Sequence, residues 1–216
     1  MREWFVPVQD RPGGSQISGE RRAAFHEAGH CCVAIATRYV VDSVRIYPGE
    51  DGWGGSCDVL TSSQHPSLTQ VAVAGCVAEA RADAIAVGAD VVEVSPETVD
   101  TIFIYVRDVA RGEKTLAIPV DFSTQSALFA ISSISIGDAR MMPRYYRRRS
   151  DIRDETNTVL QFLKDPAAWA LVSSLADAIC NSEKRVLFRR QIENAADPTA
   201  LGQIWRRLRD AALLGK

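Results

Sequence analysis

The order of apolar, polar and turn-forming residues predicts a chain that is built mainly from helices. An apolar run with helical periodicity follows Ser18, a residue type that favours helix N-caps, so we expect a first helix over residues 19–38. β-Branched residues, then a cluster of Pro, Gly and Asp, and then a Gly-rich return predict a strand, a turn and a second strand over 43–60. The N-terminal third is therefore expected to hold a helix and a β-hairpin.

The rest of the chain shows helical patterns separated by helix-breaking residues. A second helix, rich in Ala and Val, is expected from Pro66 to Gly88, and Ser95 followed by Pro96 predicts a third over 96–112. Helical patterning resumes after Pro119 and continues to about 164, and three more helices follow. These last helices are separated by Pro166, Ser182 and Pro198. The predicted fold is mainly α, with a small β-hairpin or sheet near the N-terminal third.

Composition narrows the class of protein. The chain has 216 residues, of which 46% are hydrophobic and 24% charged, which is typical of one globular domain. Its net charge of −2 argues against a large field that would attract nucleic acid. It has five cysteines and no C-x-x-C pair, which disfavours a disulfide framework or a zinc knuckle. The chain lacks an apolar run long enough to span a membrane and an apolar secretory leader, so we expect a cytoplasmic protein.

Candidate chemistry lies in the first predicted helix, which contains the H-E-x-x-H sequence His26-Glu27-Ala28-Gly29-His30. A spacing of four places both imidazoles on one helix face, where their nitrogens can reach one Zn²⁺. Zinc lowers the pKa of a bound water, and Glu27, next to the first ligand, can take a proton from that water and pass it to a leaving amine. The motif predicts metal-assisted hydrolysis of a peptide bond.

Two histidines do not complete a catalytic zinc site, because such sites usually have three protein ligands and one open position. Pattern alone leaves the third ligand open among Glu79, Asp83, Asp100, Asp108 and His65. The motif is also compatible with two histidines on a helix surface that bind no metal, or with a relative that has lost its activity.

The residues around the motif resemble the peptidase domain of FtsH-type AAA+ zinc metalloproteases. The resemblance covers roughly residues 18–195, and its most specific part is the H-E-x-G-H core with the order of elements around it. It is carried by Phe25–His30, by the strand Val44–Pro48, by the Ala-Gly-x-x-Ala-Glu helix Val73–Ala80, by Ser95–Asp100 and, less specifically, by Leu160–Ile192.

This resemblance implies a zinc-peptidase-like helical bundle in which His26, His30 and Asp100 bind zinc and Glu27 is the general base. Glu79 is the alternative third ligand. The expected organisation is a flexible N-terminal arm, 1–17, and a single FtsH-peptidase-like domain, 18–216, with a metal-site part, 18–112, and a C-terminal helical part, 113–216. The implied function is that of a zinc-dependent endopeptidase; the alternative is a catalytically inactive regulator or adaptor on the same fold.

Expectations about partners follow from the same residues. The return strand could add the backbone of a substrate to its edge, with Gly54, Gly55 and Ser56 as substrate-binding residues. The sequence has no G-x-x-x-x-G-K-[ST] loop, so a peptide or an unfolded protein would arrive alone or from a separate ATPase, and self-association is a further option. The basic run 144–149 has acidic neighbours, which argues against nucleic acid as a partner.

Overall fold

The computed structural model describes residues 17–49, 52–60, 67–89 and 149–214. The predicted arm falls outside these ranges apart from Ile17. The predicted third helix, 96–112, and the helical stretch from Pro119 to residue 148 also lie outside the described residues. Several candidate ligands fall in the same gaps, namely His65, Asp100 and Asp108.

Helix α1 spans Gly19–Ala36 and confirms the predicted first helix and its cap. The hydroxyl of Ser18 accepts a hydrogen bond from the backbone N–H of Arg21 at 3.3 Å, which satisfies one of the free donors of the first turn. Nearly all of the helix after its first turn is buried. An α-helix that is buried on most sides must lie inside the fold, and this position brings the H-E-x-x-H residues into the interior.

The hairpin consists of β1, Val40–Gly49, and β2, Gly52–Leu60, which pair antiparallel with an irregularity between Val41 and Ser43. β1 begins three residues before the predicted start at residue 43. The cause lies at the end of α1, where Arg38 takes the left-handed conformation, with φ of 69°, and reverses the chain within two residues. The strand can therefore start as soon as the helix has ended.

A third strand, β3, spans Val186–Phe188 and pairs antiparallel with β1. This strand was not predicted, because three residues are too few to show the alternation that marks a strand. The sheet order is β2-β1-β3, so a segment near the C-terminus completes the sheet. Among the described residues β2 pairs with β1 alone, which makes β2 an edge strand.

The other described elements are helices. The prediction for 66–88 is confirmed by α2, and the three helices predicted after Pro166 are all present, with β3 inserted before the second of them. The side chain of Asp165 caps the first of these three by accepting from the N–H of Ala167 at 2.9 Å. The helices are α2, Ser67–Ala86; α5, Arg149–Lys164; α6, Pro166–Asn181; α7, Arg189–Ala195; and α8, Pro198–Leu214.

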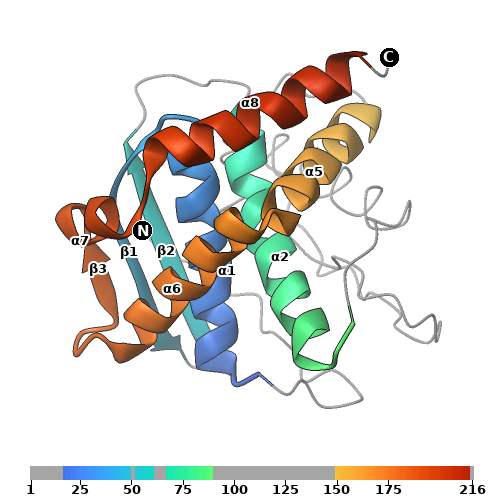
Figure 1. Ribbon diagram of the computed structural model, residues 1–216. Coiled ribbons are helices and arrows are strands. Elements are labelled where there is room, and N and C mark those ends of the chain that lie inside the picture. The colour runs from blue at the N-terminus through green and yellow to red at the C-terminus, as the bar shows by residue number, and fades with distance from the viewer. Residues whose placement is uncertain (1–16, 50–51, 61–66, 90–148, 215–216) are drawn as a thin grey trace, which may run out of the picture.

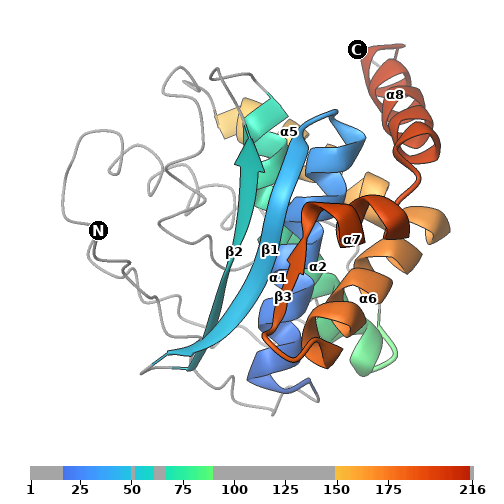
Figure 2. The same cartoon turned by 90° about the vertical axis from the view of Figure 1, so that its left-hand side faces the viewer.

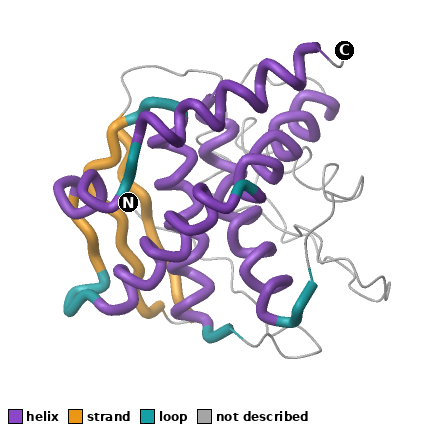
Figure 3. Tube along the Cα trace, in the orientation of Figure 1, coloured by secondary structure: helices purple, strands orange, loops and turns teal. Residues whose placement is uncertain are grey.

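Helix α1 forms the centre of this arrangement. One side of α1 packs on β1 and β2, and its other sides pack on α2 and α6 (Figures 1 and 2). Helix α8 crosses near the end of α1 and also contacts α5. Figure 3 shows the strands gathered on one side of the helices. The described part is thus mainly α with a small antiparallel sheet, as predicted, and α1 is held between a sheet layer and a helix layer.

A stack of rings and guanidinium groups joins α1, α2 and α6. The rings of Phe25 and Trp169 lie parallel with centroids 5.6 Å apart. Arg21 lies over the Phe25 ring at 5.5 Å from its centroid, and Arg81 lies over Trp169 at 4.7 Å from its centroid. Because Phe25 is part of this stack, the stack holds α1 in place at the residue just before His26.

No helix in the described ranges is long and apolar enough to cross a membrane.

Candidate metal centre

The two histidines of the motif present the same ring nitrogen to one point on α2. The Cβ of an alanine at position 75 would lie 2.4 Å from Nε2 of His30 and 2.5 Å from Nε2 of His26. Their rings meet edge to face with centroids 4.8 Å apart. Both Nε2 atoms therefore converge beside the bare backbone of Gly75, where any side chain would displace them.

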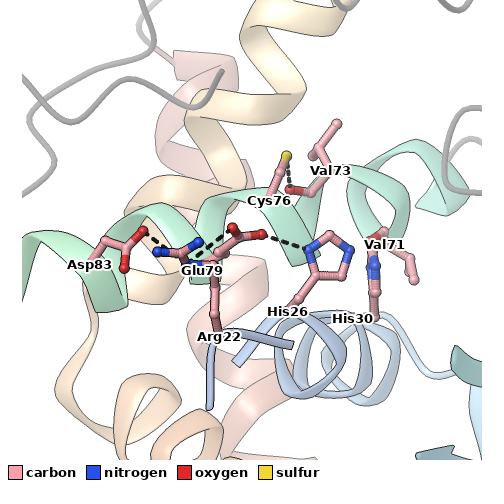
Figure 4. A network of polar contacts seen from close by, with 8 residues as sticks. All are labelled: Arg22, His26, His30, Val71, Val73, Cys76, Glu79 and Asp83. Carbon is pink, nitrogen blue, oxygen red and sulfur yellow. Dashed lines mark hydrogen bonds and ion pairs between the residues drawn. The ribbon is translucent and has the colours of Figure 1, made fainter. Parts of the chain in front are cut away.

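The other ring nitrogen of each histidine is held by α2. Nδ1 of His30 lies 2.6 Å from the carbonyl oxygen of Val71, and Nδ1 of His26 lies 3.2 Å from Oε2 of Glu79 (Figure 4). A carbonyl oxygen and a carboxylate can only accept, so both Nδ1 atoms must carry the proton. In a neutral imidazole this leaves the lone pair on Nε2, the nitrogen that converges with its neighbour. Metal-binding histidines are typically oriented by such partners.

Small residues allow α1 and α2 to approach closely enough for these contacts. The Cβ of an alanine at position 29 would lie 2.6 Å from both the carbonyl oxygen of Ala74 and the Cβ of Ala78. Both distances are far below van der Waals contact, so only glycine fits there at the present helix separation. The glycine of the H-E-x-G-H sequence is thus a packing residue between the two helices.

Glu27 faces the other layer, toward the sheet. Its side chain is buried, with the residue only 6% exposed, and it lies against the backbone of Gly55 on β2. The Cβ of an alanine at position 55 would lie 2.5 Å from Cγ and 2.7 Å from Oε1 of Glu27. The motif therefore has two sides, with imidazoles toward α2 and the carboxylate toward the edge strand.

A pair of thiols continues the contact between α1 and β2. Cys31 lies one turn after Glu27, and Cys57 lies two residues after Gly55. The pKa of the Cys57 thiol is raised well above its ordinary value by a hydrogen bond with Cys31, then by burial and by the nearby negative charges of Cys31, Glu27 and Asp58. Neither thiol belongs to a disulfide.

A buried cation lies one turn before His26. Nε of Arg22 is 3.7 Å from Oε1 of Glu79 and 3.5 Å from Oδ2 of Asp83, and the Arg22 side chain is only 9% exposed. Figure 4 shows Glu79 between Arg22 and His26, with all three side chains at the α1–α2 interface. The polar contacts thus form a chain from Asp83 to the first histidine of the motif.

The structure brings together some of the predicted site residues. His26 and His30 face Gly75 on α2, while Glu27 lies against Gly55 on β2. The hydroxyl of Ser56 accepts a hydrogen bond from Nε of Arg45 on β1 at 2.9 Å. Gly54 pairs with Tyr47 on β1. Asp100, the predicted third ligand, falls outside the described ranges, and within those ranges no group of three or more His, Cys, Asp or Glu is placed to hold a metal ion.

Glu79, the alternative third ligand, contacts His26 at Nδ1 rather than at the side where the Nε2 atoms meet. No site role was predicted for Arg22 or Val71, and Gly75 entered only as part of the segment Val73–Ala80. A signal was available, because positions 71, 75, 79 and 83 recur every four residues along α2, opposite positions 22, 26 and 30 on α1.

Comparison of the chain with protein-family models, curated proteins and solved structures found no match.

Proposed function

We propose that the protein is a zinc-dependent endopeptidase in which His26 and His30 bind the metal and Glu27 is the general base. The observation that carries this proposal is the convergence of the two Nε2 atoms beside Gly75 while both Nδ1 atoms are held by α2. With Nδ1 protonated, each Nε2 keeps its lone pair, so the two imidazoles could bind one ion together. The residues present therefore fit two of the ligands of a zinc ion.

The third ligand that we propose is Asp100, from the resemblance of its segment to the metalloprotease family. The contact of Glu79 with Nδ1 of His26 suits a residue that orients a ligand, not one that binds the ion. A zinc ion bound here would supply a Lewis acid that polarises a peptide carbonyl and activates water. The chain itself supplies the position of the imidazoles and the base.

Glu27 would transfer the proton from the sheet side of the motif. Its carboxylate is buried against Gly55, so an extended peptide lying along the edge of β2 would pass close to it. Edge strands bind such peptides through main-chain hydrogen bonds. Glu27 would accept a proton from the attacking water and deliver it to the leaving amine. The proposed substrate is therefore an extended peptide or an unfolded protein.

The experiment is a peptidase assay of Glu27→Gln beside a measurement of zinc content. The amide keeps the size of the carboxylate and cannot act as the base, so we expect zinc binding within about threefold of the unmodified protein and a loss of at least about 100-fold in cleavage of an unfolded protein. Cleavage at the original rate by the Gln variant would refute the assigned base.

Two further variants test the ligand set. Asp100→Asn should abolish tight zinc binding, whereas Glu79→Gln should weaken it only about 10- to 100-fold, as expected for an orienting partner. Asp108→Asn is the matched control, because it removes the same charge from the same predicted helix. Zinc binding by the unmodified protein without any cleavage, over a range of unfolded substrates, would favour the inactive regulator or adaptor.

A further inference from the structure

Arg22 is a buried cation in a position that packing alone does not explain. Its side chain is 9% exposed, and arginine is rarely buried unless its charge is matched. It lies four residues, about one helical turn, before His26 on the face of α1 that contacts α2. A smaller or apolar residue would fill the same interface without the cost of removing a guanidinium from water.

The partners of Arg22 are two carboxylates of α2. Glu79 and Asp83 are four residues apart, so they are neighbours on one helix face and repel each other when both are charged. Nε of Arg22 lies between them, 3.7 Å from Glu79 and 3.5 Å from Asp83. Both distances exceed those of good hydrogen bonds, so Arg22 acts on these groups mainly through its charge.

The carboxylate of Glu79 uses its two oxygens for different partners. Oε1 faces Arg22, and Oε2 lies 3.2 Å from Nδ1 of His26 (Figure 4). Repulsion from Asp83 would turn Glu79 away, and attraction to Arg22 opposes this. The position of Glu79 at His26 therefore depends on the charge of Arg22.

We propose that Arg22 is a positioning residue, which holds the Glu79 carboxylate on Nδ1 of His26 and thereby fixes the orientation and tautomer of the first metal ligand. The inference rests on the proposed function, since it assigns Arg22 a role toward the same metal. In the metal-free protein, loss of the charge at position 22 should leave the His26 proton shared between Nδ1 and Nε2.

The test is nitrogen NMR of the histidine rings in the metal-free protein at pH 8, where imidazoles are neutral. In the unmodified protein His26 should show a protonated Nδ1 and an unprotonated Nε2. Arg22→Met should convert it to a mixture of tautomers, whereas Arg22→Lys, which keeps a positive charge at nearly the same place, should restore the original signal. An unchanged tautomer in Arg22→Met would overturn the proposal.

Zinc affinity, measured by competition with a chelator, provides the second readout. Arg22→Met should weaken binding about 10-fold, as removal of outer partners of metal ligands does. It should cause no further loss in a Glu79→Gln background, because Arg22 acts through Glu79. A loss of the same factor in both backgrounds would contradict this route. If Arg22→Met does not fold, Arg22→Gln, which removes the charge but keeps a polar end in the interface, carries the same predictions for the tautomer and for zinc.

The two hypotheses fail in different ways. If the unmodified protein binds no zinc, the proposed function fails, and the tautomer of His26 in the metal-free variants still decides the role of Arg22. If zinc binds and the tautomer ignores position 22, the positioning role fails while the metal centre stands.

Discussion

The carboxylate of Glu27 on α1 lies directly against the backbone of Gly55 on β2, where the Cβ of an alanine would come within 2.7 Å of Oε1. Gly55→Ala must therefore displace the proposed base. Because misplacement of a catalytic group by about 1 Å can cost about 100-fold, we expect kcat/KM for an unfolded substrate to fall by roughly that factor. Zinc binding should stay within about threefold, since the histidines face the opposite layer. Unchanged activity would remove Glu27 from the mechanism.

Gly75 provides the complementary test on the metal side. An alanine here would place its Cβ 2.4 Å and 2.5 Å from the two Nε2 atoms, so the rings must move apart. Gly75→Ala should weaken zinc binding at least about 100-fold in a chelator competition. Gly202→Ala is the matched control, because its nearest neighbour would be the carbonyl oxygen of Ala36 at 3.8 Å. Equal zinc affinity in both variants would show that no metal lies beside Gly75.

Gly29 is expected to matter for stability. Gly29→Ala would bring a methyl group within 2.6 Å of the carbonyl oxygen of Ala74, which forces α1 and α2 apart. Overpacking of this kind costs about 1–3 kcal/mol. Gly202→Ala adds the same group to a helix with room for it and should stabilise by about 0.5–1 kcal/mol through helix propensity. Urea unfolding of the two variants measures the contrast, and a stabilised Gly29→Ala would contradict the observed packing.

From the raised pKa of the Cys57 thiol we predict that the free energy of unfolding depends on pH. Its pKa is raised in the folded protein, first by the hydrogen bond with Cys31 and next by burial, so above about pH 8.5 the unfolded chain has lost a proton that the folded chain keeps. The contribution is fully present below that pH and is lost as the pH rises further, by at most about 1.4 kcal/mol per pH unit. Unfolding in urea at pH 7.5 and 10 should therefore show a smaller loss for Cys57→Ala than for the unmodified protein. Equal losses would contradict the raised pKa.

Much of the described fold could be predicted, because its elements carry local signals. Ser18 marks the start of α1, and the cap Asp165 precedes the proline that opens α6. β3 was missed for the opposite reason. Its three residues form a strand because β1 offers them a free edge, and this partner lies about 140 positions earlier in the chain.

The residues of the candidate site also differ in whether a local sequence signal marks them. His26, Glu27 and His30 could be found from their spacing, since helix geometry alone places the two imidazoles on one face. The roles of Gly55, Gly75 and Arg22 depend on how closely β2 and α2 approach α1, and spacing within one element does not contain that information. Gly29 belongs to both groups, because the motif contains it while its packing role required the position of Ala74.

The central claim is that His26 and His30 together bind one divalent metal ion. Its most direct test is the zinc stoichiometry and affinity of the unmodified protein, His26→Ala, His30→Ala and His65→Ala, measured by chelator competition. His65 is the remaining histidine of the chain and serves as the control for binding by any imidazole. We expect one tightly bound zinc per chain in the unmodified protein and in His65→Ala, and none in the other two variants. Zinc that stays bound in His26→Ala, or that leaves in His65→Ala, would contradict the assigned centre.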